Sequence, residues 1–132
     1  MKDTEAAWLA GILEGEACFD WNRGSRLWPR LRIEMKDEDI ILRIKALVDS
    51  LPAAQARPTR AKIICKAGKQ SNHSDTYTFQ VARRDLMKPL LEAIRPWMSE
   101  RRGCLIDEML ESLDRIQAIR EANLAAVAAG IL

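Results

Sequence analysis

The chain has 132 residues, 48% of them hydrophobic, and a formal net charge of +2; it is long enough for one domain with its own core, and no apolar run reaches the roughly 18 residues of a membrane span. Its three cysteines, Cys18, Cys65 and Cys104, are odd in number and lack C-x-x-C spacing, so neither a disulfide framework nor a zinc knuckle is indicated. The N-terminus lacks the pattern of a signal peptide, and we expect an intracellular protein of the cytoplasm, nucleoid or an organelle matrix, not secreted and without a membrane partner.

A first helix is predicted over about residues 5–14, with Thr4 as its N-cap. Its buried side follows helical periodicity and comprises Trp8, Leu9, Ile12 and Leu13. Ala7, Gly11 and Gly15 share another face, because residues four apart stack over one another. Glycine costs a helix roughly 1 kcal/mol relative to alanine, so the two glycines favour close approach of another backbone. In the alternative interpretation, Gly15 is a left-handed C-cap beside two solvated carboxylates.

Two strands are predicted next, at about residues 17–22 and 30–35, with a turn at 23–25 between them. Asp37 is the expected N-cap of a helix over about residues 38–49, which has apolar residues at helical spacing. Pro52 and Pro58 bracket a predicted loop.

A second pair of strands is predicted at about residues 60–66 and 76–81, joined by a polar stretch that contains His73, which we expect to be simply exposed. A helix over about residues 84–94 follows, and one or two helices occupy about residues 99–129 beyond Pro96. The apolar residues of the tail, 103–132, follow helical spacing and are assigned to the core: Leu105, Met109, Leu113 and Ile116. The order α-β-β-α-β-β-α, with additional helix at the end, indicates one α+β domain.

Positive charge is concentrated in two stretches, residues 23–36 with about +4 and residues 57–70 with about +5. Strand alternation places most of this charge on one face of the sheet and the apolar residues on the other. A polar face is ordinary in antiparallel sheets, but its richness in Arg and Lys indicates a polyanion surface able to read base edges. Trp28 at its margin either packs or stacks on a base. The candidate DNA contacts are Asp20, Asn22, Arg23, Arg26, Trp28, Arg30, Arg32, Glu34, Arg60, Lys62, Lys66, Lys69, Thr76, Thr78 and Gln80.

The segment Leu-Ala-Gly-Ile-Leu-Glu-Gly-Glu at residues 9–16 resembles the signature of the LAGLIDADG homing endonucleases, with Ala17 in place of the final glycine. The resemblance extends over most of the chain to about Arg102 and does not place the tail. It implies a single LAGLIDADG domain, in which helices lie on one face of a four-stranded antiparallel, saddle-shaped sheet and an extra helix ends the chain.

The same resemblance implies a site-specific endonuclease that cleaves double-stranded DNA with a divalent cation, Mg²⁺ or another. In the family, the acid at the eighth motif position binds the metal with help from the preceding backbone carbonyl, which corresponds to Glu16 and Gly15 here. Hard cations prefer such oxygen ligands. Glutamate is one methylene longer than the usual aspartate, which changes its reach without abolishing ligation. Glu14 is interpreted as a structural acid at the helix end.

Two further catalytic positions are implied less directly. The family often has a glutamine at the end of the second strand, where this chain has Met35 followed by Lys36; Met35 cannot order water, and Lys36 is the candidate. A basic residue is expected after the Pro96-Trp97 pair, and Arg101 is the candidate, with Arg102 beside it. Arginine there stabilises a charged transition state but is a poor proton donor.

The chain has one such motif and no internal repeat, whereas cutting two strands needs two sites. Single-motif members of the family act as homodimers, so Ala7, Gly11 and Gly15 are the predicted dimer interface and the target is palindromic or pseudo-palindromic. Two alternatives remain on the same scaffold: a cleavage-deficient, sequence-specific DNA-binding protein, and an RNA-binding intron maturase.

Overall fold

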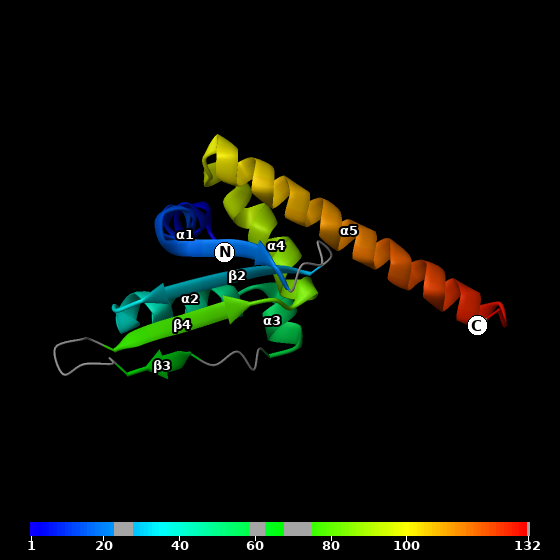
Figure 1. Ribbon diagram of the computed structural model, residues 1–132, viewed down its shortest axis with the longest axis horizontal. Helices are drawn as coiled ribbons and strands as arrows, with labels where there is room; N and C mark the ends of the chain where they lie inside the picture. The colour runs from blue at the N-terminus through cyan, green and yellow to red at the C-terminus, as the bar shows by residue number, and fades with distance from the viewer. Residues whose placement is uncertain (23–27, 59–62, 68–74, 132) are drawn as a thin grey trace.

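The protein is described here by a computed structural model that covers residues 1–22, 28–58, 63–67 and 75–131. Its elements, shown in Figure 1, are α1 (Asp3–Glu16), β1 (Ala17–Trp21), β2 (Pro29–Met35), α2 (Glu38–Asp49), α3 (Pro52–Ala56), β3 (Ile64–Lys66), β4 (Thr76–Val81), α4 (Arg84–Ile94), the 3-10 helix η2 (Arg95–Trp97) and α5 (Glu100–Ala128). The predicted α+β class and the order of the main elements are confirmed.

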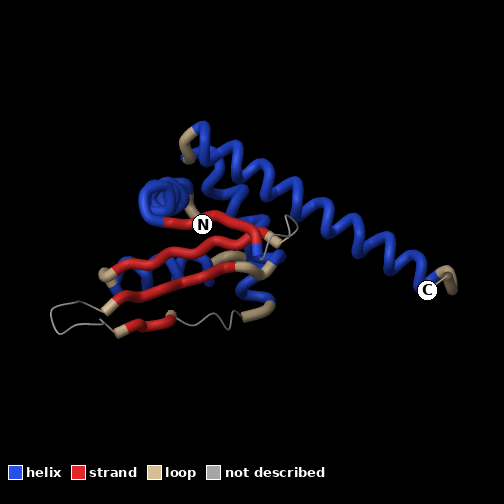
Figure 2. The backbone as a smooth tube through the Cα atoms, in the orientation of Figure 1, coloured by secondary structure: helices blue, strands red, loops and turns tan. Residues whose placement is uncertain are grey.

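The four strands form one antiparallel sheet in the order β1-β2-β4-β3. Its covered face is apolar and belongs to the main core, with Ala17, Phe19, Leu31, Ile33, Phe79 and Val81 all buried. In the view of Figure 2, α2 lies behind β2 and β4, and no helix of the described residues covers these strands on the viewer's side. The alternation predicted from the sequence therefore divides this sheet into a packed face and an uncovered face.

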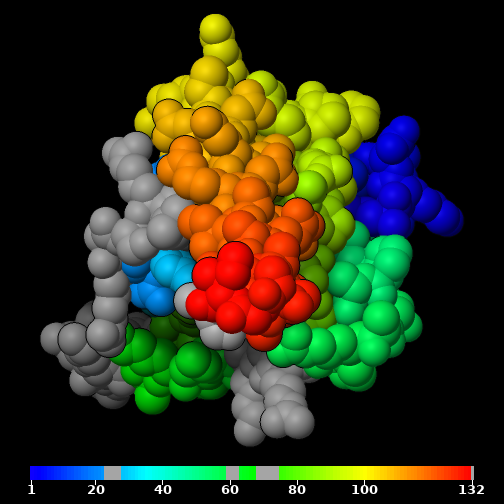
Figure 3. Space-filling model, turned by 90° about the vertical axis from the view of Figure 1, so that its right-hand side faces the viewer, coloured from blue at the N-terminus to red at the C-terminus, as the bar shows by residue number. Residues whose placement is uncertain are grey.

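Helix α5 joins the core through its first half only. Ile106, Met109, Leu113 and Ile116 are buried, and Leu105 is half-buried, which confirms the core assignment of these residues except for the partial exposure of Leu105. Beyond them the helix runs past the rest of the molecule (Figure 1), and its C-terminal residues stand in front in the side view of Figure 3. Within the described ranges, no helix is long and apolar enough to cross a membrane.

Four local predictions need correction or qualification. Thr4 is not the N-cap, because α1 begins at Asp3 and the backbone N–H of Lys2 donates to Glu5 Oε1 at 2.9 Å. The loop expected between the two prolines contains α3, since proline suits the first turn of a helix, where its missing N–H is not needed. Of the one or two helices predicted over about residues 99–129, the structure has one, because α5 runs unbroken from Glu100 to Ala128, with Ser99 as its N-cap. Of the third predicted strand, only Ile64–Lys66 is seen, and residues 59–62 lie outside the described part.

The two faces of the sheet offer a matched test of this packing. Ile33 is 1% exposed and Ile64 is 64% exposed, so Ile33→Ala should lower the free energy of unfolding by about 2–5 kcal/mol. Ile64→Ala should change it by less than about 0.5 kcal/mol. Urea denaturation of both variants, followed by circular dichroism, measures the difference, and equal effects would contradict the assignment of faces.

Candidate functional site

The motif helix passes into the sheet without a loop. Helix α1 ends at Glu16, and β1 begins at Ala17. Leu13 and Ala17 are buried while Glu16 is exposed, so the glutamate points outward at the corner between helix and strand. Gly15 lies within the helix, and its φ is not positive, since Gly130 is the one glycine of the described residues with a positive φ. The alternative interpretation of Gly15 as a left-handed C-cap is therefore wrong.

An open pocket of about 390 Å³ lies beside this corner. Its lining comes from the end of α1, the end of β2 and the start of β4, and comprises Glu16, Glu34, Met35, Lys36, Asp37 and Thr76. The fold thus brings Glu16 and Lys36, both predicted catalytic candidates, to one pocket. Three carboxylates against one lysine give the pocket a negative charge, which favours a cation.

Two pocket residues have roles that the sequence did not indicate. Asp37 stands at the N-cap position of α2, as predicted, but its side chain makes no cap hydrogen bond, and it lines the pocket instead. Met35 is half-buried and packs against the core. It pairs across the sheet with Tyr77, which also packs against the core and pairs in turn with Cys65. Lys36, just past the strand, is exposed.

The donor chemistry of Glu16 fits a hard divalent cation, since carboxylate and carbonyl oxygens are the ligands that such ions prefer. Within the part of the chain that the structure describes, however, no three Asp, Glu, His or Cys side chains converge on one point. One chain therefore offers the Glu16 carboxylate at this pocket, and a cation held there would complete its coordination with other oxygens. The Gly15 carbonyl as a second ligand stays a prediction.

Arg102, rather than the predicted Arg101, contacts the motif. Its Nη1 donates to the carbonyl oxygen of Ala17 at 3.1 Å, and its Nε lies 3.2 Å from Oε2 of Glu14. Arg101 is exposed and does not line the pocket. The sequence held no local signal for Arg102, because its contacts reach residues 85 and more positions earlier in the chain.

Glu14 is a structural acid, as predicted. Its Oε1 also accepts a hydrogen bond from the backbone N–H of Ser99 at 2.7 Å. Partial burial raises the pKa of Glu14, but the hydrogen bonds from Ser99 and the charges of Arg102 and Arg101 outweigh it and hold that pKa below its usual range.

The uncovered face of the sheet carries polar residues in cross-strand rows, because directly paired residues of antiparallel strands share a face. The rows are Asp20–Arg30, Cys18–Arg32–Gln80, Glu34–Thr78–Ile64 and Lys66–Thr76. Arg32, Glu34, Gln80 and Lys66 are exposed. The predicted DNA-contact residues of these strands thus lie on one face, with the exposed Ile64 among them.

Arg30 does not stand free on this face. Its Nε and Nη2 each donate to a carboxylate oxygen of Asp20 at 2.8 Å. These hydrogen bonds hold the pKa of Asp20 below its usual range, against the partial desolvation of the carboxylate. Arg32 is exposed, so of the two arginines on β2 it is the more accessible to solvent.

The remaining predicted DNA contacts fall at the margins. The backbone N–H of Asn22 donates to the carbonyl of Trp28 at 2.9 Å, and the guanidinium carbon of Arg84 lies 5.2 Å from the centre of the half-exposed Trp28 ring. Trp28 therefore packs on a neighbouring side chain, as one of its two interpretations proposed, and its contact with a base stays a prediction. Arg23, Arg26, Arg60, Lys62 and Lys69, together with His73, lie outside the described residues.

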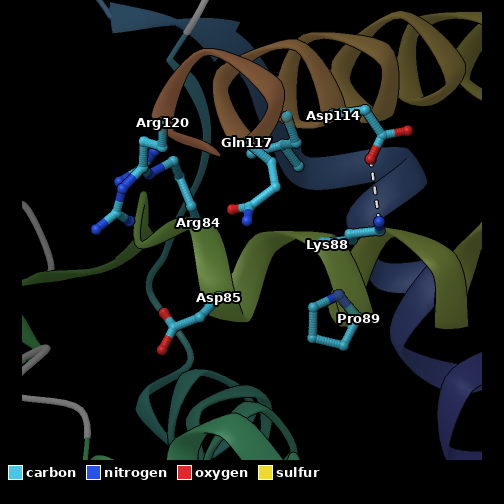
Figure 4. Close-up of a pocket in the computed structure, with 8 residues that line it drawn as sticks. Arg84, Asp85, Lys88, Pro89, Asp114, Gln117 and Arg120 are labelled. Atoms are coloured by element: carbon cyan, nitrogen blue, oxygen red, sulfur yellow. Dashed lines mark hydrogen bonds and ion pairs between the residues drawn. The ribbon is translucent and has the colours of Figure 1, made fainter. Parts of the chain in front are cut away.

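A second hollow, of about 290 Å³, lies between α4 and α5 and contains none of the predicted site residues. Figure 4 shows its polar side chains, with Lys88 Nζ paired to Asp114 Oδ1 at 3.0 Å. The hydrogen bond to Asp114 raises the pKa of Lys88. This lysine is thereby engaged in holding the two helices together, and the candidate site remains the pocket at Glu16.

The small-residue face of α1 has no neighbour within the described chain. Gly11 and Gly15 are exposed, and a Cβ atom built on either would meet no heavy atom within 4 Å. Ala7 is half-buried. The close approach that the two glycines predict is thus not made by this chain to itself.

Neither a protein-family model nor a curated protein matches the sequence. Among solved structures, the chain is similar to the homing endonuclease I-CvuI in complex with its target in the presence of 2 mM Ca (TM-score 0.59, 14% identity, 96% of this chain and 76% of that chain). It is also similar to I-CvuI in complex with the I-CreI target in the presence of 2 mM Mg, in which the DNA is not cleaved. The TM-score is 0.62 and the identity 16%, and the match covers 96% of this chain and 77% of that chain.

A third similar structure is the group I intron-encoded homing endonuclease I-CeuI in complex with DNA (TM-score 0.56, 16% identity, 94% of this chain and 60% of that chain). These likenesses establish the fold. The chain has the LAGLIDADG homing endonuclease fold predicted from its motif.

The Asp20–Arg30 pair makes the stability of the uncovered face depend on pH. Because the pKa of Asp20 is lower in the folded protein than in the unfolded chain, the pair stabilises the fold above the unfolded pKa, and this contribution is lost as the pH falls through the folded pKa. The two side chains are 25% and 35% exposed, so Asp20→Asn should cost less than about 1 kcal/mol at neutral pH.

This difference should disappear at acidic pH, below the folded pKa of Asp20. Urea unfolding across a pH series checks it, with Glu34→Gln, two rows away on the same face, as the control. A deficit in Asp20→Asn that grows as the pH falls would refute the pairing.

Proposed function

We propose that the protein is a homodimeric, site-specific endonuclease of the homing type, which cleaves the phosphodiester bonds of double-stranded DNA with a divalent cation. The observation that carries the proposal is the position of Glu16, exposed in a negatively charged pocket at the edge of an uncovered polar sheet face. The similar solved structures are homing endonucleases in complexes with DNA, which supports the same use of this face. Such a protein would act inside cells, where its DNA target lies.

The pocket residues divide the chemistry in this proposal. Glu16 and the Gly15 carbonyl would hold Mg²⁺ or a similar ion, and such an ion would supply Lewis-acid activation of water and charge stabilisation for the leaving oxygen. Lys36 lies in the same pocket and supplies positive charge near the scissile phosphate, as Arg101 does from the start of α5. On the sheet, Arg32, Gln80 and Lys66 are exposed donors for phosphates and base edges.

A second subunit completes the site in this proposal. One chain brings one motif carboxylate, and no other part of the described chain covers its Gly11/Gly15 face. Packing two such faces across a two-fold axis would bring two Glu16 side chains together, and the symmetry predicts a palindromic or pseudo-palindromic target.

Replacing Glu16 by glutamine tests the catalytic assignment. Glu16→Gln removes the charge but keeps the shape, so cleavage with Mg²⁺ should fall by at least about 100-fold, while DNA affinity changes by less than about threefold. The substrate is a duplex that the purified protein enriches from a random-sequence pool, and gel assays follow binding and cutting. Glu5→Gln, at the start of the same helix, is the control.

If Glu16→Gln cuts DNA as fast as the unaltered protein does, the catalytic assignment of Glu16 is wrong. If the unaltered protein binds DNA but does not cut it, the protein is a DNA-binding protein on this scaffold.

Gly11→Ala tests the dimer. In an isolated subunit the new methyl group meets no atom within 4 Å, so the substitution should stabilise the helix by up to about 1 kcal/mol. If two such faces pack together, the methyl groups separate the helices, and the dimer dissociates at a higher protein concentration. Sedimentation velocity over a concentration series measures the second effect and urea unfolding the first. A dimer unaffected by Gly11→Ala would exclude this face as the interface.

A further inference from the structure

The segment that carries the proposed metal ligands is held on both sides by the start of α5. On its N-terminal side, Glu14 accepts a hydrogen bond from the Ser99 backbone N–H at 2.7 Å. Glu14 also forms an ion pair with Arg102, whose buried Nε lies 3.2 Å from Oε2 but makes no hydrogen bond within the described residues. On its C-terminal side, the carbonyl of Ala17 accepts a hydrogen bond from Arg102 Nη1 at 3.1 Å. The one guanidinium of Arg102 therefore contacts the residues on both sides of the Gly15-Glu16 pair.

This arrangement is sheltered and well supported. The Arg102 side chain is 19% exposed and that of Glu14 is 31% exposed, so solvent screens their attraction less than it screens a surface pair. The guanidinium carbon also lies 5.3 Å from the centre of the Phe19 ring. Ser99 Oγ accepts the backbone N–H of Arg102 at 3.3 Å, which ties the base of the arginine to the same helix N-terminus, where the Glu14 carboxylate is also favoured by the helix dipole.

Gly15 and Glu16, which lie between these two contacts, need such support. Gly15 lies one residue before Glu16, and glycine leaves the backbone more freedom than any other residue. The exposed face of α1 adds no contact to Gly15 within the described chain. Metal ligands must be held to within about 0.5 Å of their productive geometry, and a misplacement of about 1 Å can lower a rate by about 100-fold.

We propose that Arg102, paired with Glu14, is a positioning residue that fixes the Gly15 carbonyl and the Glu16 carboxylate through contacts with the residues on either side of them. This inference rests on the proposed function, because fixing Glu16 matters for cleavage only if Glu16 holds the cation. It also assigns α5 a role in the site: its N-terminus is the support against which the end of α1 is held.

The test compares Arg102→Gln with Asp107→Asn. Asp107, also in the first half of α5, pairs with Arg95 of η2 at 2.8 and 3.0 Å. Neither residue makes a hydrogen bond or an ion pair with residues 14–17 in the described part of the chain, so this pair is the matched control. Hydrogen exchange of the backbone amides of residues 14–18, measured on the protein alone by NMR, reports whether the segment is held. Arg102→Gln should accelerate this exchange by about tenfold or more, and Asp107→Asn should leave it unchanged.

Cleavage of the selected duplex supplies the second measurement. Arg102→Gln should lower the single-turnover rate by about 10- to 100-fold and raise the Mg²⁺ concentration needed for half-maximal rate, with the DNA dissociation constant changed by less than about threefold. Arg102→Lys keeps the cation but lacks the planar fork of donors, so it should recover part of the rate. Glu14→Gln removes the pair from the other side with little change of shape and should reproduce the loss, which keeps the test open if Arg102→Gln does not fold.

Equal effects of Arg102→Gln and Asp107→Asn, or a loss of DNA affinity without a loss of rate, would overturn the proposal. Unchanged exchange at residues 14–18 would do so as well. If the unaltered protein cuts no DNA with Mg²⁺, the proposed function fails, and the exchange measurement still decides whether Arg102 holds the segment.

Discussion

The direct passage from helix to strand at Glu16 and Ala17 constrains the rest of this structure. With no loop between α1 and β1, the burial of Leu13 on one side and Ala17 on the other fixes the direction in which Glu16 points. Ala17 in turn pairs with Ile33 in the middle of the sheet, so the core that stabilises the fold also sets the orientation of the candidate ligand. A loop at this point would separate the position of the carboxylate from the packing of the core.

Electrostatics then distinguish residues that the pattern alone treats as equivalent. Arg30 and Arg32 are two residues apart on the same face of β2, yet Arg30 is held by Asp20 while Arg32 is exposed. Arg101 and Arg102 are adjacent on α5, yet Arg102 is committed to Glu14 and Ala17. In each pair one guanidinium is held by contacts within the protein, and the other is exposed to solvent.

The elements that the sequence predicted well were those with a strong periodic signal. The bounds of α2, α4 and β4 agree with the predicted ranges, because their apolar residues repeat at helical or strand spacing and their ends are marked. The errors were local. Thr4 was chosen as the N-cap although α1 begins at Asp3, and α3 was taken as a loop because Pro52 and Pro58 were interpreted as its two ends. Short segments have too few residues for periodicity to outweigh a single capping or breaking signal.

The sequence by itself determined the fold class, the alternation of the sheet faces and the position of Glu16 between the motif helix and the first strand, because these follow from the spacing of apolar residues along a short stretch of chain. The tertiary structure alone decided that Lys36 and Asp37 join Glu16 in one pocket and that Arg102 reaches back to the motif. It also decided that no side chain or backbone of another described element packs on the Gly11/Gly15 face. Such contacts join residues far apart in the chain, and no local pattern encodes them, because they depend on how the helices pack across the sheet.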